Sequence, residues 1–226
     1  MSPSLNPFGH RAMTKKALYK LVERLDETYN CVDHFEALTE KRGYDNSKQF
    51  PANLYKRGIQ KELLDHWSES PSVHTLTSNS DQFDAGIAGC EWAAFLRVRN
   101  PEAVVLRVRP TSRTASAGDI LRQLISSLIY NLATLVPEEF EKADLSKDNF
   151  ELLAQGGAGG VGAGLKILAA LPPLEVRRGG ILIIVDGLNL AEDARTADEV
   201  RRFKSVLESL SAQNYGHLLY TMGQRR

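Results

Sequence analysis

The sequence predicts an α/β fold, in which a parallel sheet is covered by helices and preceded by a helical leader. Its most informative segment is the run 181–185, five consecutive β-favouring aliphatic residues followed by Asp186-Gly187. Such an uninterrupted apolar run is typical of a central strand that is buried on both faces. Apolar segments with strand and helix periods alternate along the rest of the chain, as right-handed βαβ units require.

Composition excludes several classes of protein. Of the 226 residues, 28 are basic and 28 acidic, so no net charge attracts nucleic acid or an acidic membrane. Cys31 and Cys90 are too few for a disulfide framework or a metal cluster, which indicates a reducing, cytoplasmic compartment. No signal peptide stands at the N-terminus, and no apolar run approaches the roughly 20 residues that span a bilayer.

We expect three parts along the chain. They are a flexible N-terminus (1–13), a helical leader (14–70) and an α/β domain that lacks its last strand (71–226). The leader contains two amphipathic stretches, 14–39, with Thr14 as N-cap, and 51–67. The segment 68–72, rich in serine and proline, marks the boundary.

The α/β part is predicted to alternate strands and helices. Strands are expected at 73–78, 103–108, 181–185 and 216–221, and helices at 90–98, 120–132, 147–155, 165–171 and 197–212. Asp119 is expected to cap the second of these helices. Arg107 and Arg109 could bind phosphate or RNA, but we favour solvated charges at the rim of the sheet.

Asp186 is the principal candidate for a functional residue. Ligands of open α/β sheets bind outside the carboxyl ends of the strands, where Asp186 is predicted to lie. In P-loop NTPases an aspartate at this point, the Walker B aspartate, holds Mg²⁺ beside the phosphates. The phosphate-binding signature G-x-x-x-x-G-K-[S/T] occurs nowhere in the chain.

The order of elements resembles the nucleotide-binding domains of STAND-class P-loop NTPases, particularly the NACHT-like modules of fungal signalling proteins. The resemblance rests on the segments 73–98 and 104–132, on Asp186-Gly187-Leu188, and on the strand that ends at Thr221. It implies the strand order 5-1-4-3-2 and, where the nucleotide site is intact, Mg-ATP or Mg-GTP as cofactor. The residues that it places at the nucleotide are Asp186, Gly187, Asn189, Gly86, Gly89 and Thr221, with Asp186 on the metal.

The chain departs from this family where the chemistry is done. The turn 79–90 has no lysine and carries Asp81 and Asp84, so the Walker A motif is degenerate. A like-charge pair at 4 Å costs on the order of 4 kcal/mol, which backbone amides would hardly offset. Asn189 stands where the family has a second carboxylate, for which Glu192 or Asp193 could substitute only if the loop folds back.

Two functions follow from these departures. The first is a regulatory or interaction module of NTPase-like fold that does not hydrolyse nucleotide. The second is an atypical ATP- or GTP-binding NTPase, in which Asp186 holds Mg²⁺, Thr221 senses the γ-phosphate and the amides of residues 86–90 bind phosphates.

Two further segments carry expectations. Gly157, Gly159 and Gly162 form G-x-G-x-x-G, but residues 150–155 before them read as helix, so a flexible linker is favoured over a dinucleotide loop. Without a fifth strand, residues 73–78 form an edge that invites self-association or a protein partner. The leader is the alternative cover, so a monomer that aggregates without residues 1–70 is expected slightly more than a homodimer.

Overall fold

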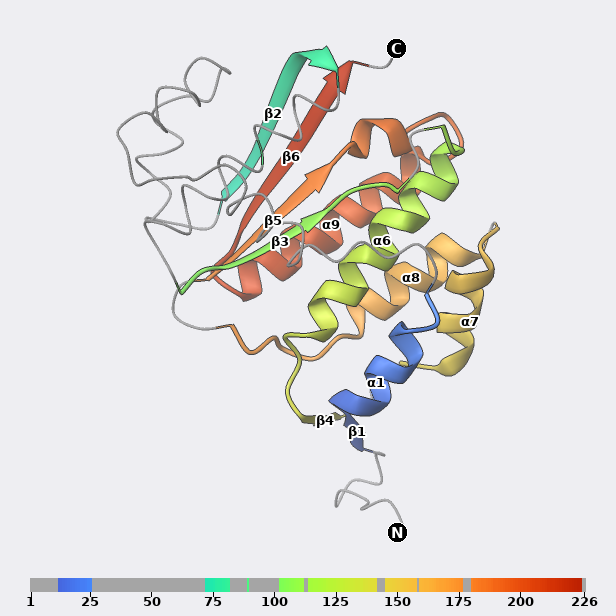
Figure 1. Ribbon diagram of the computed structural model, residues 1–226, viewed down its shortest axis with the longest axis vertical. Helices are drawn as coiled ribbons and strands as arrows, with labels where there is room; N and C mark the ends of the chain where they lie inside the picture. The colour runs from blue at the N-terminus through green and yellow to red at the C-terminus, as the bar shows by residue number, and fades with distance from the viewer. Residues whose placement is uncertain are drawn as a thin grey trace, which may run out of the picture.

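The computed structural model describes residues 12–25, 72–81, 89, 102–111, 114–141, 145–157, 159–176 and 180–224. Its centre is a sheet with four strands in the order β2 (Ser72–Asp81), β6 (His217–Gln224), β5 (Ile181–Asp186) and β3 (Val104–Val108) (Figure 1). All three neighbouring pairs are parallel, which confirms the α/β parallel sheet. The order is the one that the resemblance implies for its first four strands, although a fold by itself does not determine function.

β5 is the central strand that its apolar run predicts. All six of its residues are buried, and Ile183 is fully inaccessible to solvent. In the register of the sheet, Ile183 lies between Leu106 of β3 and Leu218 of β6. The prediction that Asp186 ends a parallel strand between these two neighbours is therefore confirmed.

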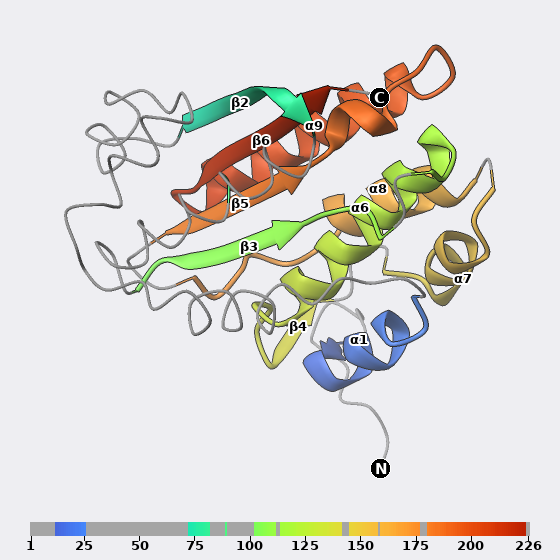
Figure 2. The same cartoon turned by 45° about the horizontal axis from the view of Figure 1, so that its top comes forward.

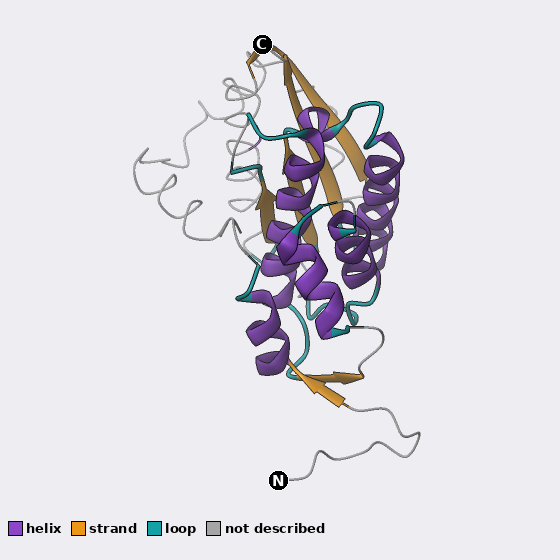
Figure 3. Ribbon diagram, turned by 90° about the vertical axis from the view of Figure 1, so that its right-hand side faces the viewer, coloured by secondary structure: helices purple, strands orange, loops and turns teal. Residues whose placement is uncertain are grey.

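Helices cover one face of this sheet in the part of the chain that the structure describes. α6 (Ala117–Ala133) packs on β3, α9 (Ala197–Gln213) packs on β5 and β6, and α8 (Gly160–Ala169) packs on both helices (Figure 2). α7 (Lys147–Gln155) lies outside α8, so the helices form a thick layer beside the sheet (Figure 3). The helix expected at 90–98 lies outside the described residues. None of the described helices is long and apolar enough to cross a membrane.

The alternation of side chains along β5 decides where Asp186 points. Ile181, Ile183 and Val185 belong to the hydrophobic core beneath the helices. Leu182 and Ile184 are equally buried but lie outside that core, because successive side chains of a strand point to opposite faces. Asp186 shares the face of Leu182 and Ile184, opposite to α6 and α9.

The N-terminal segment joins the same core. Thr14 caps α1 (Lys15–Val22) by accepting a hydrogen bond from the Ala17 N–H at 3.2 Å, as predicted. The helix ends at Val22, far short of residue 39. β1 (Ala12–Thr14) pairs antiparallel with β4 (Glu139–Glu141), so residues 12 and 13, which were expected in the flexible N-terminus, lie in a strand. Leu18 and Val22 are fully buried in the core that contains α6, while the second leader helix, 51–67, lies outside the described residues.

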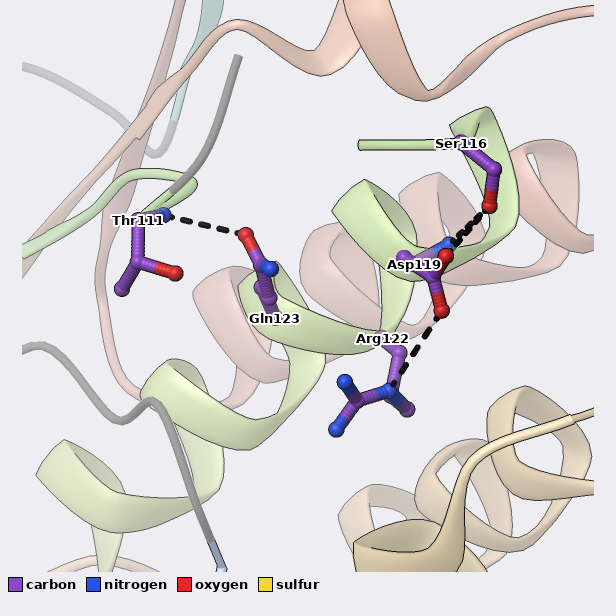
Figure 4. Close-up of polar contacts among 5 residues, drawn as sticks. All are labelled: Thr111, Ser116, Asp119, Arg122 and Gln123. Carbon is purple, nitrogen blue, oxygen red and sulfur yellow. Dashed lines mark hydrogen bonds and ion pairs between the residues drawn. The ribbon is translucent and has the colours of Figure 1, made fainter. Parts of the chain in front are cut away.

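The cap of α6 differs from the expected one. Ser116, and not Asp119, is the N-cap, because its hydroxyl oxygen accepts the Asp119 N–H at 3.2 Å (Figure 4). The Ser116 hydroxyl in turn donates to Asp119 Oδ2 at 2.6 Å. Asp119 remains favourable in the first turn, where a carboxylate faces the positive end of the helix dipole.

Candidate functional site

Asp186 lies in a buried cluster with two side chains from the neighbouring strands. Arg107 of β3 donates from Nε to Asp186 Oδ2 at 2.6 Å, and its Nη2 also contacts Oδ2. The hydroxyl of Thr221, on β6, donates to the other oxygen, Oδ1, at 2.5 Å. Both oxygens of the carboxylate therefore have partners that the chain itself supplies.

This cluster is isolated from water. Arg107 is 6% exposed, Asp186 3% and Thr221 not at all. A buried carboxylate is tolerated only when it is paired and hydrogen-bonded, because removal of a charge from water is costly. The three described side chains meet this requirement with one positive and one negative charge, and they tie the carboxyl end of the central strand to both of its neighbours.

Gly89 lies directly beside the cluster. A Cβ atom at Gly89 would be 2.9 Å from Thr221 Cγ2 and 3.7 Å from Asp186 Oδ1, so the backbone approaches the carboxylate closely. Gly89 is helical and buried, whereas a loop was expected at this position. Gly86, its partner in the predicted phosphate turn, lies outside the described residues.

Two other predicted site residues have structural partners. Gly187 adopts a left-handed conformation (φ 75°), which glycine tolerates best, and its N–H donates to the Thr221 carbonyl at 3.1 Å. Asn189, in the short helix η1 (Leu188–Ala191), donates from Nδ2 to the Gly223 carbonyl at 2.9 Å. Both contacts hold the loop after β5 against β6.

Asp193 does not supply the missing second carboxylate. Its Oδ1 accepts the N–H of Arg195 at 2.8 Å and that of Thr196 at 3.0 Å, so the side chain closes the turn before α9. The Arg195 hydrogen bond is the main reason that the pKa of Asp193 is below its usual value. Glu192 forms an ion pair with Lys204 of α9, in which Oε2 is 3.8 Å from Nζ, and both side chains are partly exposed.

Arg107 is the functional candidate that sequence reasoning misread. The expectation of a solvated charge at the sheet rim is wrong, because Arg107 is buried and bound to Asp186. The signal that could have identified the pair is the register of the two strands. Arg107 pairs with Ile184, which lies two residues before Asp186 and points to the same face of the sheet. A long basic side chain there can reach an acid at the end of the neighbouring strand.

The described residues do not fit a magnesium site at Asp186. Mg²⁺ requires near-octahedral oxygen ligands at about 2.0–2.1 Å, and a guanidinium already contacts Oδ2. In the described part of the chain, no three His, Cys, Asp or Glu residues gather closely enough to hold a metal ion. The assignment of Asp186 as metal ligand stays a prediction, and it requires Arg107 to move away.

A cavity of about 370 Å³ lies where the N-termini of α6, α8 and α9 meet. Its charged lining consists of Asp119, Arg122, Asp193, Arg195 and Glu199. Figure 4 shows Asp119 between Ser116 and Arg122, whose Nε is 4.0 Å from the carboxylate. Because acids outnumber bases, and because Asp119 is bound by Ser116 and Asp193 closes the turn before α9, this cavity does not have the lining of a phosphate site.

The glycine-rich segment is a packing element and not a linker. Residues 160–164 lie in α8, and α7 precedes them, so the expected flexible linker is wrong while the expected helix before it is confirmed. A Cβ atom at Gly164 would be 2.5 Å from Ile125 Cγ2 and 3.1 Å from Leu153 Cδ1. The missing side chain lets α8 approach α6 and α7 closely.

We expect Gly164→Ala and Gly162→Ala to have opposite effects on stability. Gly164→Ala should lower the free energy of unfolding by about 1–3 kcal/mol, because its methyl group overlaps Ile125. A Cβ atom at Gly162 meets nothing within 4 Å, so Gly162→Ala should raise the free energy of unfolding by roughly 0.5–1 kcal/mol, because alanine has the higher helix propensity. Urea unfolding of both variants checks this, and equal effects would contradict close packing at Gly164.

Comparison with known proteins does not assign the chain to a family. No family model matches the sequence, and no curated protein is similar to it.

Proposed function

We propose that this chain is a regulatory or interaction module with an NTPase-like fold, and that it does not hydrolyse nucleotide. The observation that carries the proposal is the closed state of Asp186, whose two carboxylate oxygens are held by Arg107 and Thr221. The strand order supports the NACHT-like, STAND-class resemblance. The degenerate Walker A turn and Asn189 support the loss of hydrolysis.

Differential scanning fluorimetry tests this proposal. The unfolding temperature is measured with Mg-ATP, with Mg-GTP, and with each nucleotide plus EDTA. A ligand at 100 times its Kd stabilises the folded state by about 2.7 kcal/mol, which is readily detected. We expect no magnesium-dependent shift with either nucleotide, because Asp186 is closed. A reproducible shift that EDTA removes would show that nucleotide binds and would overturn the closed, non-binding site on which the proposal rests.

The position of Gly89 favours a second candidate, an atypical ATP- or GTP-binding protein. Gly89 is helical and close to Asp186 Oδ1, and it belongs to the segment whose amides this candidate uses to bind phosphates. Steady phosphate release that Asp186→Ala abolishes would establish this function. Release that is unchanged in the variant comes from a contaminating enzyme.

The proposed interaction involves the outer edge of β2. β2 is the last strand in the sheet order, and no described strand pairs with its outer side. Val73 on this strand is 48% exposed. α1 cannot cover this edge, because it packs on α6 and α7 at the other side of the molecule (Figures 1 and 2). The rest of the leader, 26–71, lies outside the described residues.

Light scattering during size-exclusion chromatography tests the edge. Deletion of residues 1–70 is a poor probe, because it also removes Leu18 and Val22 from the core. Val73→Lys is the better variant, since lysine on an edge strand opposes strand pairing. Because α1, the described part of the leader, packs away from this edge, we now expect association in place of the monomer favoured from the sequence. The wild-type chain should associate at tens of micromolar, and Val73→Lys should associate less. Identical monomers would contradict this proposal.

A further inference from the structure

The contact between Arg107 and Asp186 is a complete ion pair in the interior of the protein. Two guanidinium nitrogens, Nε and Nη2, contact the same oxygen, Oδ2. The Thr221 hydroxyl donates to Oδ1, and the backbone at Gly89 closes the same side. A carboxylate in such surroundings requires a cation, and β3 provides one as a side chain.

We infer that Arg107 is the resident cation of Asp186 and occupies the position from which a divalent metal ion would contact this carboxylate. The chain thereby excludes the metal with its own guanidinium. This inference rests on the proposed function and deepens it, because it names the residue that closes the site.

Charge and ligand supply both support this assignment. A divalent ion on Asp186 would lie against the positive charge of Arg107, and because both side chains are buried, bulk solvent would screen the repulsion little. The described residues also do not bring three His, Cys, Asp or Glu side chains together into a group that could hold the metal ion. Removal of Arg107 should therefore leave a buried anion beside a space that accepts an external cation.

The test uses the full chain and four proteins: wild type, Arg107→Gln, Asp186→Asn and the double variant Arg107→Gln/Asp186→Asn. The probe is Mn²⁺ alone, and the unfolding temperature is the readout. Arg107→Gln should unfold roughly 10 °C below wild type, because it leaves Asp186 without its cation. We expect Mn²⁺ to recover several degrees in this variant and to leave wild type and the double variant unchanged.

The controls separate this inference from the proposed function. A Mn²⁺ response in wild type that Asp186→Asn removes, or no response in Arg107→Gln, would overturn the inference, whereas nucleotide-dependent shifts bear on the function alone. Should Arg107→Gln fail to fold, the double variant decides. Recovery of folding in it supports the assignment, because the unpaired carboxylate is then absent, and continued failure overturns it.

Discussion

Ile183→Asp is expected to unfold the domain. Ile183 is fully buried in the middle of the central strand and points into the core beneath the helices. An unpaired carboxylate there costs several kcal/mol, and the lost apolar contacts add about 2–5 kcal/mol, a large part of the typical stability of a domain. Circular dichroism of the purified variant should show little cooperative unfolding.

Thr75→Asp is the matched control for this variant. Thr75 lies on β2 of the same sheet, in register with Tyr220, and its side chain is exposed. The same charge should therefore change stability by about 0.5 kcal/mol or less at this position. A folded Ile183→Asp protein with a cooperative transition close to that of Thr75→Asp would contradict the position of β5 at the centre of the fold.

The second large effect is expected at Gly180, immediately before the central strand. Its φ of 71° lies in the left-handed region, and a Cβ atom there would be 2.4 Å from the Tyr215 carbonyl oxygen. Its own carbonyl accepts the Val104 N–H at 3.0 Å, so the backbone is held on both sides. Gly180→Ala should lower the free energy of unfolding by about 3 kcal/mol, from the backbone strain and the overlap together.

Gly157→Ala separates these two costs. Gly157 has a φ of 75°, but a Cβ atom there meets nothing within 4 Å. This variant should lower the free energy of unfolding only through backbone strain, by about 1–2 kcal/mol. If urea unfolding gives equal losses for the two variants, the close contact between Gly180 and Tyr215 does not exist.

Local signals in the sequence were sufficient for the sheet. The apolar run of β5 and the segments that became β3 and β6 identified three of the four strands of the sheet. The run of β5 is uninterrupted because this strand is buried on both faces. α7 and α9 were predicted from apolar residues that recur every three or four positions. Thr14 was predicted as an N-cap from its position directly before such a pattern.

Features that depend on close approach between distant segments were missed. The same glycines that allow α8 to pack on α6 also have the composition of a linker, and only the tertiary structure distinguishes the two. Arg107 was misread because a charge at a strand end is usually solvated, and its partner is 79 residues away in the sequence. The resemblance placed Asn189 at the nucleotide, and in the structure its amide donates to the Gly223 carbonyl of β6.

The central claim is that Asp186 is closed by Arg107 and Thr221 and does not bind a magnesium nucleotide. A crystal structure of the full chain grown with Mg²⁺ and a non-hydrolysable ATP analogue tests it most directly. We predict that Arg107 Nε and Thr221 Oγ1 remain on the two oxygens of Asp186, with no metal ion on the carboxylate. A magnesium ion bound to Asp186, with the Arg107 side chain displaced and phosphates beside Gly89, would contradict the account.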